Sequence, residues 1–179
     1  TVRRLRVDPN DANVVVAASA WGGFGREGYG SDAALASQFG VKRSTDGGAN
    51  WVRTLAGQAS ALEVDPANFA RQYAAIFNQN PLVIDPGNVS NGIYRSTNGG
   101  VTWSRIEGPW GSPLGRIELA GAPSDPNVLY AGISSTDNPG LLGLYRTDNA
   151  WADQPTWIQI PTEATGSGGH CGGKCGYSH

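Results

Sequence analysis

Short hydrophobic runs recur along the chain in a fixed order, separated by polar turn-forming residues. The first kind of run ends in or near Asp-Pro and lies at 5–9, 62–66 and 117–126. The second kind follows it and lies at 14–18, 72–77 and 128–133. Runs of about four to eight residues rich in valine, isoleucine and tyrosine, bounded by Pro, Asn and Asp, are typical of β-strands.

A longer phrase completes each repeat. It reads GVKRSTDGGANW from Gly40 to Trp51 and GIYRSTNGGVTW from Gly92 to Trp103. A diverged third copy begins at Gly143 as GLYRTD, and its tryptophan is Trp157. The phrase supplies a third strand, a glycine-rich turn and the start of a fourth strand. Each repeat therefore contains four strand-like runs.

Four antiparallel strands repeated every 50 residues or so predict the blades of a β-propeller. A β-sandwich is the alternative, but it does not require the same phrase at the same place in each repeat. The sequence predicts an all-β fold, a propeller segment of about three four-stranded antiparallel blades that is incomplete at both ends. The expected parts of this single partial propeller, residues 1–179, are blades at 3–55, 59–107 and 116–160, then a loop and the start of a further blade at 161–179.

The phrase has a physical explanation that involves no catalysis. The Asp46 and Asn98 side chains are expected to accept backbone N–H bonds within the turn, while glycine permits positive φ. Trp51 and Trp103 are expected to fold beneath the turns and to be buried between blades. A structural role is accordingly predicted for Ser44, Asp46, Gly48, Trp51, Ser96, Asn98, Gly100, Trp103, Asp148 and Trp157.

The stretches from Ser44 to Trp51 and from Ser96 to Trp103 resemble the Asp-box, the bacterial neuraminidase repeat, whose pattern is roughly Ser-x-Asp-x-Gly-x-Thr-Trp. Sialidases, xyloglucanase-type glycoside hydrolases, sortilin-type receptors and photosystem assembly factors are built from such repeats. The resemblance implies a propeller whose ligands meet the rim opposite the boxes. It also implies a glycoside-hydrolase-like protein that acts on or binds carbohydrate, or a non-enzymatic scaffold for a protein partner.

The long links between the second and third strands of each repeat, and those between repeats, are expected to lie at this opposite rim. Long loops on a rigid scaffold commonly carry function. The aromatic and charged residues in these links are equally compatible with binding a sugar and with packing on one another. The candidate rim residues are Trp21, Arg26, Glu27, Tyr29, Asp32, Asp85, Trp110 and Asp137.

Enzymatic activity is left open by the sequence. Hydrolysis of a glycosidic bond requires two carboxylates placed across it, and no carboxylate here has a diagnostic motif. A sialidase needs arginines that converge on a carboxylate, whereas Arg43, Arg95 and Arg146 share one repeat position, which favours a scaffold role. No catalytic residue is predicted.

Composition and charge narrow the remaining classes. The chain has 39% hydrophobic and 16% charged residues with a net charge of −2, so nothing indicates binding to nucleic acid or a membrane. Cys171 and Cys175, flanked by His170 and His179, fit a loop-closing disulfide first, a metal site second and free thiols third. We expect a disulfide, no metal site and no cofactor, and a secreted protein, extracellular or periplasmic. The expected partners are the remaining blades of the same protein or another chain, with a glycan as candidate ligand.

Overall fold

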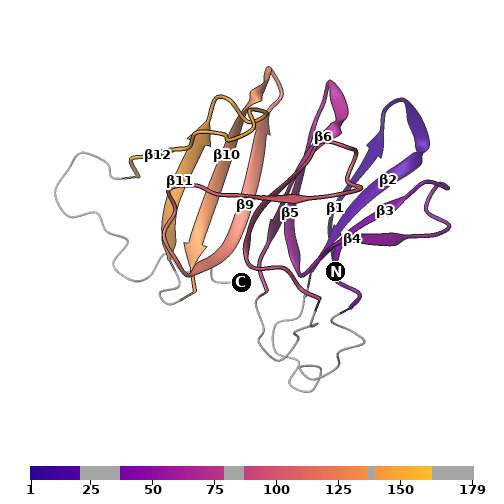
Figure 1. Cartoon of the computed structure of the whole chain (residues 1–179), viewed down its shortest axis with the longest axis horizontal. Coiled ribbons are helices and arrows are strands. Elements are labelled where there is room, and N and C mark those ends of the chain that lie inside the picture. Colours follow the sequence, from indigo (N-terminus) through magenta and orange to yellow (C-terminus); the bar gives the residue numbers. More distant parts are fainter. Residues whose placement is uncertain (21–36, 79–86, 137–139, 163–179) are drawn as a thin grey trace.

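The computed structural model describes residues 1–20, 37–78, 87–136 and 140–162. They form three four-stranded antiparallel sheets, which lie side by side in Figure 1. The predicted all-β propeller segment is therefore confirmed, and each sheet is one blade. None of the residues in these ranges belongs to a helix that is long and apolar enough to cross a membrane.

Each blade takes its strands in chain order from one edge of the sheet to the other. The first blade consists of β1 (Val2–Asp8), β2 (Asp11–Ser19), β3 (Gly40–Ser44) and β4 (Val52–Ala56). The second consists of β5 (Ala59–Asp65), β6 (Asn68–Ile76), β7 (Gly92–Ser96) and β8 (Ser104–Ile106). The third consists of β9 (Leu114–Ala122), β10 (Asp125–Ser135), β11 (Leu141–Thr147) and β12 (Ile158–Ile160).

Two kinds of turn share one rim of the propeller. In each blade, a backbone N–H in the turn before the fourth strand donates to a carbonyl at the hairpin that joins the first two strands. The pairs are Gly47 N to Asn13 O (3.0 Å), Gly99 N to Ala70 O (2.9 Å) and Ala150 N to Asn127 O (3.0 Å). The described ends of the links between the second and third strands consequently lie at the opposite rim, as predicted.

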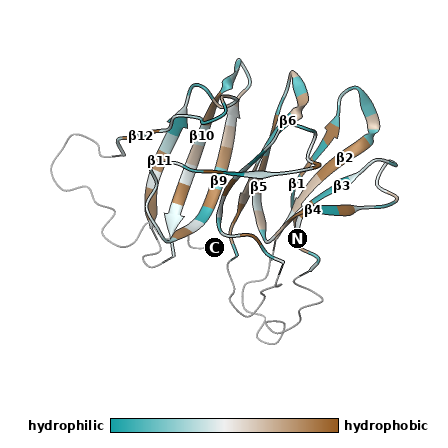
Figure 2. Ribbon diagram, in the orientation of Figure 1, coloured by the Kyte–Doolittle hydropathy of each residue, from teal (hydrophilic) through white to brown (hydrophobic). Residues whose placement is uncertain are grey.

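The hydrophobic core lies between the blades, because successive side chains of a strand point to opposite faces of its sheet. In β6, Ala74 and Ile76 pack against the first blade, whereas Tyr73 and Ala75 pack against the third. Hydrophobic and hydrophilic positions run through all three sheets in Figure 2. Each blade is thus held by its neighbours rather than by a core of its own.

Candidate functional site

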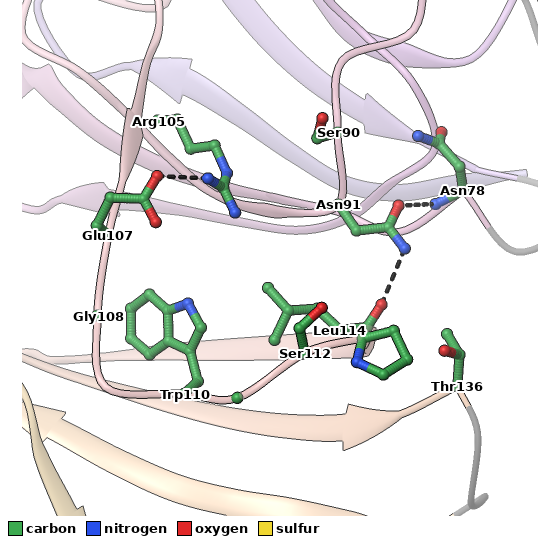
Figure 3. Close-up of a pocket in the computed structure, with 12 residues that line it drawn as sticks. Asn78, Ser90, Asn91, Arg105, Glu107, Gly108, Trp110, Ser112, Leu114 and Thr136 are labelled. Atoms are coloured by element: carbon green, nitrogen blue, oxygen red, sulfur yellow. Dashed lines mark hydrogen bonds and ion pairs between the residues drawn. The ribbon is translucent and has the colours of Figure 1, made fainter.

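The larger cavity, of about 590 Å³, lies at the long-link rim between the second and third blades. The link from β8 to β9 forms one wall, and the ends of the links after β6 and β10 form the others. The side chains named in Figure 3 line it: Asn78, Ser90, Asn91, Arg105, Glu107, Trp110, Ser112, Leu114 and Thr136. Three separate links of the chain therefore build this cavity.

Two asparagines fix the relative positions of these links. The Asn91 amide oxygen accepts from the Asn78 backbone N–H (2.8 Å), and its amide nitrogen donates to the Leu114 carbonyl (2.9 Å). The Asn78 amide donates to the Val89 carbonyl (2.8 Å) and accepts from the Gln58 backbone N–H (3.0 Å). Both side chains thus serve as supports that hold the described parts of these links together.

Arg105 and Glu107 provide the charges of the cavity. They lie on β8 and just after it, two residues apart, and form an ion pair. Figure 3 shows this pair above the Trp110 ring, with the two asparagines farther along the same opening. The Glu107 side chain remains 74% exposed and the Arg105 side chain 39% exposed, so both are available to a ligand. Glu107 is the one carboxylate among the described residues that line the cavity.

Trp110, a candidate rim residue for which the sequence left ligand binding and packing equally open, is packed in the core and lines the cavity with its edge. Only 8% of it is exposed. Its ring meets Tyr145 edge-on at 5.6 Å and Trp157 at 5.3 Å between centroids. A Cβ atom on Gly108 would lie 2.3 Å from this ring, so the backbone and the indole are in direct contact. Trp110 shapes the wall of the cavity and offers no free face for stacking.

The remaining predicted rim residues lie outside the described residues. These are Trp21, Arg26, Glu27, Tyr29, Asp32, Asp85 and Asp137. Cys171 and Cys175 also lie outside them, so the predicted disulfide stays a prediction. Sequence reasoning missed Asn78, Asn91, Arg105 and Glu107. Only the Arg-Ile-Glu triplet that ends the second repeat is a local signal for any of them.

A smaller cavity, of about 160 Å³, lies at the other rim between the same two blades. Its ionisable groups are already paired within the protein. Arg6 lies 3.7 Å from Glu63, and Arg71 lies 3.6 Å from Asp65. Burial raises the pKa of Glu63, against the opposing effect of Arg6, and burial also raises the pKa of Tyr73 to about 12. The Glu63 and Asp65 side chains are only 22% and 1% exposed, against 74% for Glu107, so this cavity is a weaker candidate for a ligand site than the larger one.

The turn from Ser44 to Trp51 is held by its own side chains. The Ser44 hydroxyl donates to Asp46 Oδ1 (2.7 Å) and accepts from the Gly48 backbone N–H (2.9 Å). Asp46 also accepts from the Asn50 backbone (2.9 Å) and side chain (2.7 Å). These bonds, led by the Asn50 backbone N–H, lower the pKa of Asp46 to about 2. The carboxylate is engaged in the turn and points to no substrate.

The second turn repeats this pattern with an amide in place of the carboxylate. Asn98 Oδ1 accepts from the Ser96 hydroxyl (2.9 Å) and from the Thr102 backbone N–H (2.9 Å). The Asn98 amide nitrogen donates to the Thr102 hydroxyl (2.8 Å). Gly100 adopts positive φ of 80°, as Gly48 does at 92°. The two turns therefore have the same local structure.

The third turn uses a different residue from the one predicted. Asn149, not Asp148, accepts from the Thr147 hydroxyl (2.8 Å) and from the Thr156 backbone N–H (2.9 Å). Asp148 points away and pairs with Arg146. Thr147 takes the place of Ser44, so Asn149, two residues on, takes the place of Asp46, and the extra residues of this longer turn follow Asn149. The expectation for Asp148 was wrong because the sequence was aligned on its carboxylate.

The burial predicted for Trp51 was also wrong, since 38% of this residue is exposed. Its indole N–H donates to the Gly48 carbonyl within its own turn (2.9 Å). The equivalent Trp103 is half-buried and donates instead to the Thr54 hydroxyl of the first blade (3.2 Å). The turn tryptophan of one blade therefore packs on the preceding blade. Trp51 has no preceding blade among the described residues.

No family model and no curated protein matches the sequence. Solved structures match its fold. An ancestral GH74 enzyme superimposes with a TM-score of 0.60 at 20% identity, covering 89% of this chain and 18% of that one. A GH74 enzyme of Niastella koreensis gives 0.52 at 19% identity, covering 90% and 23%. YCF48 bound to D1 peptide gives 0.48 at 16% identity, covering 92% and 40%.

The likenesses to the two GH74 enzymes agree with the β-propeller class defined by the three blades. At about a fifth sequence identity they establish the fold alone. The chain spans 18% and 23% of the length of the two GH74 chains. The activity of those whole enzymes does not carry over with the fold, because one fold hosts many functions.

Proposed function

We propose that the chain is part of an Asp-box propeller protein, glycoside-hydrolase-like in architecture, that binds carbohydrate in the cavity between its second and third blades. The observation that supports this most directly is the Arg105–Glu107 pair at the mouth of a mainly polar cavity of about 590 Å³. Binding pockets combine a shaped wall with a few placed polar groups. Trp110 supplies the wall, and the ion pair supplies donors and acceptors for sugar hydroxyls.

A neutral sugar fits this lining better than an acidic one. Arg105 is already neutralised by Glu107, and Glu107 would repel a sugar carboxylate. The proposal is binding rather than hydrolysis, because glycoside hydrolysis requires two carboxylates flanking the bond. Of the residues described around the cavity, Glu107 alone carries one. The shared fold of the GH74 enzymes gives the proposal background support only.

A titration of the full chain with cellohexaose tests the proposal. We expect saturable binding by calorimetry and no binding of an oligogalacturonate of similar length. Glu107→Gln removes the charge and half of the acceptor capacity, so the dissociation constant should rise at least tenfold, a loss of ~1.4 kcal/mol. Glu118→Gln is the matched control, because Glu118 also pairs with an arginine two residues away but lies outside the cavity.

A second pair of variants tests whether Trp110 shapes the site. Gly108→Ala would push against the Trp110 ring, whereas a Cβ on Gly111, in the same link, meets no atom within 4 Å. We expect Gly108→Ala to weaken cellohexaose binding and Gly111→Ala to leave it unchanged. If neither glycan binds, or if Glu107→Gln and Glu118→Gln bind alike, the proposed glycan site is wrong.

The alternative, a scaffold that binds a protein partner, is supported by exposed apolar residues on the outer faces of the first and third blades.

Secretion is also proposed, because Cys171 and Cys175 are expected to form a disulfide. Mass spectrometry of the unreduced chain tests the disulfide, and two free thiols or bound zinc would overturn it.

A further inference from the structure

An arginine on the third strand of each blade precedes the turn residue Ser44, Ser96 or Thr147. In the first blade, Arg43 Nε donates to the Gly99 carbonyl in the turn of the second blade (3.0 Å). In the second blade, Arg95 donates to the carbonyls of Ala150 (3.3 Å) and Asp153 (3.2 Å) in the turn of the third. Each of these arginines therefore joins its blade to the turn of the following blade.

The turns make the complementary contact in the other direction. Trp103 packs against the first blade and donates to Thr54. Trp151, in the third turn, lies 5.0 Å from Tyr73 of the second blade, and Arg71 lies over its ring. Both internal interfaces thus pair an arginine face on one blade with a tryptophan-bearing turn on the next.

The outer face of the third blade presents the arginine half of this contact. Arg146 occupies the position of Arg43 and Arg95, but it turns back to Asp148 (2.8 Å from Nε) and lies over the Tyr130 ring. Leu129, Ala131 and Ile133 point into the core, so the alternating residues of β10 face outward. Exposed apolar residues surround Arg146: Tyr130, Leu144 and Ile158, the last of which is 68% exposed.

The outer face of the first blade presents the turn half. Trp51 is exposed there, together with Leu5 and Val7, which are 52% and 48% exposed. Across the described ranges, no side chain donates to the Gly47 carbonyl, which occupies the place that Gly99 has in the second turn.

We propose that the outer face of the third blade binds the outer face of the first blade of a second copy of this chain, head to tail. Arg146 leaves Asp148 and donates to the Gly47 carbonyl of the other copy, and Trp51 of that copy is covered. The Arg146–Asp148 pair is exposed, with side chains 43% and 58% accessible, so its rupture costs little.

A second copy is the favoured occupant because this chain contains both halves of the contact. Two third-blade faces would place Arg146 against Arg146, and two first-blade faces would leave both turns without an arginine. The contact is therefore heterologous and leads to a ring or to an open chain.

Sedimentation velocity of the full chain from about 1 to 100 µM tests this. We expect a concentration-dependent dimer in the wild type. Arg146→Glu and Trp51→Glu should each remove it, weakening association at least tenfold. Arg105→Glu is the control, because Arg105 has a similar exposure and also pairs with a carboxylate two residues away. Arg105 lies at the other rim and on neither outer face, so the Arg105→Glu variant should associate as the wild type does. Circular dichroism verifies that each variant is folded.

Mixing the two defective variants distinguishes head-to-tail contact from other modes. The Arg146→Glu copy keeps an intact first blade, and the Trp51→Glu copy keeps an intact third blade. Their equimolar mixture should form a dimer that neither forms alone. Arg146→Gln replaces Arg146→Glu if the latter does not fold. A wild-type monomer at all concentrations, unrestored association in the mixture, or association that Arg146→Glu leaves intact would overturn the proposal.

Discussion

The turns at 44–51 and 96–103 are nearly identical in sequence and in internal hydrogen bonds, yet their tryptophans have different surroundings. Trp103 is half-buried against the first blade, whereas Trp51 is 38% exposed and bonds only within its own turn. The comparison teaches that a short phrase determines a turn, because its donors and acceptors lie within about five residues. The burial of its tryptophan depends on which blade stands beside it.

The third turn extends the comparison. Trp157 is 8% exposed, but its indole N–H has no hydrogen-bond partner among the described atoms. Three residues after Trp51 stands Thr54, which receives the Trp103 N–H, whereas three residues after Trp103 stands Ile106. The acceptor that serves the second turn is therefore absent from the matching place on the second blade.

The largest expected effect is the difference between two tryptophan truncations. Trp103→Ala should lower the free energy of unfolding by about 3 kcal/mol, the lower end for a large aromatic residue, because it opens the contact between two blades. Trp51→Ala should cost about 1 kcal/mol or less, as at a largely exposed site. Urea unfolding at a concentration where the chain is monomeric measures both. Equal losses would mean that the neighbouring blade contributes nothing to Trp103.

Glycine substitution in the two turns gives a smaller difference. Gly48 and Gly100 share positive φ, so alanine costs about 1–2 kcal/mol at each. A Cβ on Gly100 would also lie 2.8 Å from Gln72 Oε1, in the buried interior, and 3.4 Å from Val16 of the first blade. On Gly48 its three nearest atoms would all belong to the Trp51 ring, the first of them at 3.5 Å.

We therefore expect Gly100→Ala to lower the unfolding free energy by about 1–3 kcal/mol more than Gly48→Ala, through overpacking. Thermal unfolding of the two variants under identical conditions checks this. Gly99→Ala is a control for backbone strain alone, since Gly99 has a positive φ of 72° and a Cβ there would meet no atom within 4 Å. A loss at Gly100 equal to that at Gly99 would contradict the crowding.

Sequence reasoning succeeded where structure is local. The strands follow from alternating apolar runs and turn residues, and the Asp46 and Asn98 roles follow from the short reach of their side chains. It failed at Trp51, whose burial depends on a neighbouring blade. It failed at Asp148 as well, because a carboxylate was expected at the accepting position, whereas the residue two positions after Thr147 is Asn149.

The candidate site was predictable only as a rim. The position of the long links indicated where a cavity would lie, but its residues come from three links far apart in the chain. Asn91 bonds to Leu114 across the gap between blades, a contact that no local pattern encodes. Trp110 is an aromatic residue in a rim link, as a ligand-binding residue would be. Only its edge contacts with Tyr145 and Trp157 show that it belongs to the core.

The smallest expected effect separates the two turns by charge. The pKa of Asp46 is lowered from 3.8 to about 2, chiefly by the Asn50 backbone N–H. Its folded pKa lies below its unfolded value, so the unfolded chain binds more protons between these two values. The contribution of Asp46 to stability is therefore present above pH 4 and is lost as the pH falls through about 2. Asn98, at the matching place, does not titrate.

Exchanging the two pairs tests this difference directly. Asp46→Asn with Asn50→Thr gives the first turn the amide and hydroxyl of the second, whose bonds are known from Asn98 and Thr102. Stability of this variant should fall less steeply than that of wild type between pH 4 and 2, measured by urea unfolding at intervals of pH. The reciprocal variant, Asn98→Asp with Thr102→Asn, should fall more steeply. Parallel acid slopes in all three proteins would show that the hydrogen bonds to Asp46 do not favour its charged form, because a carboxylate bound equally well in both states of protonation leaves no pH dependence.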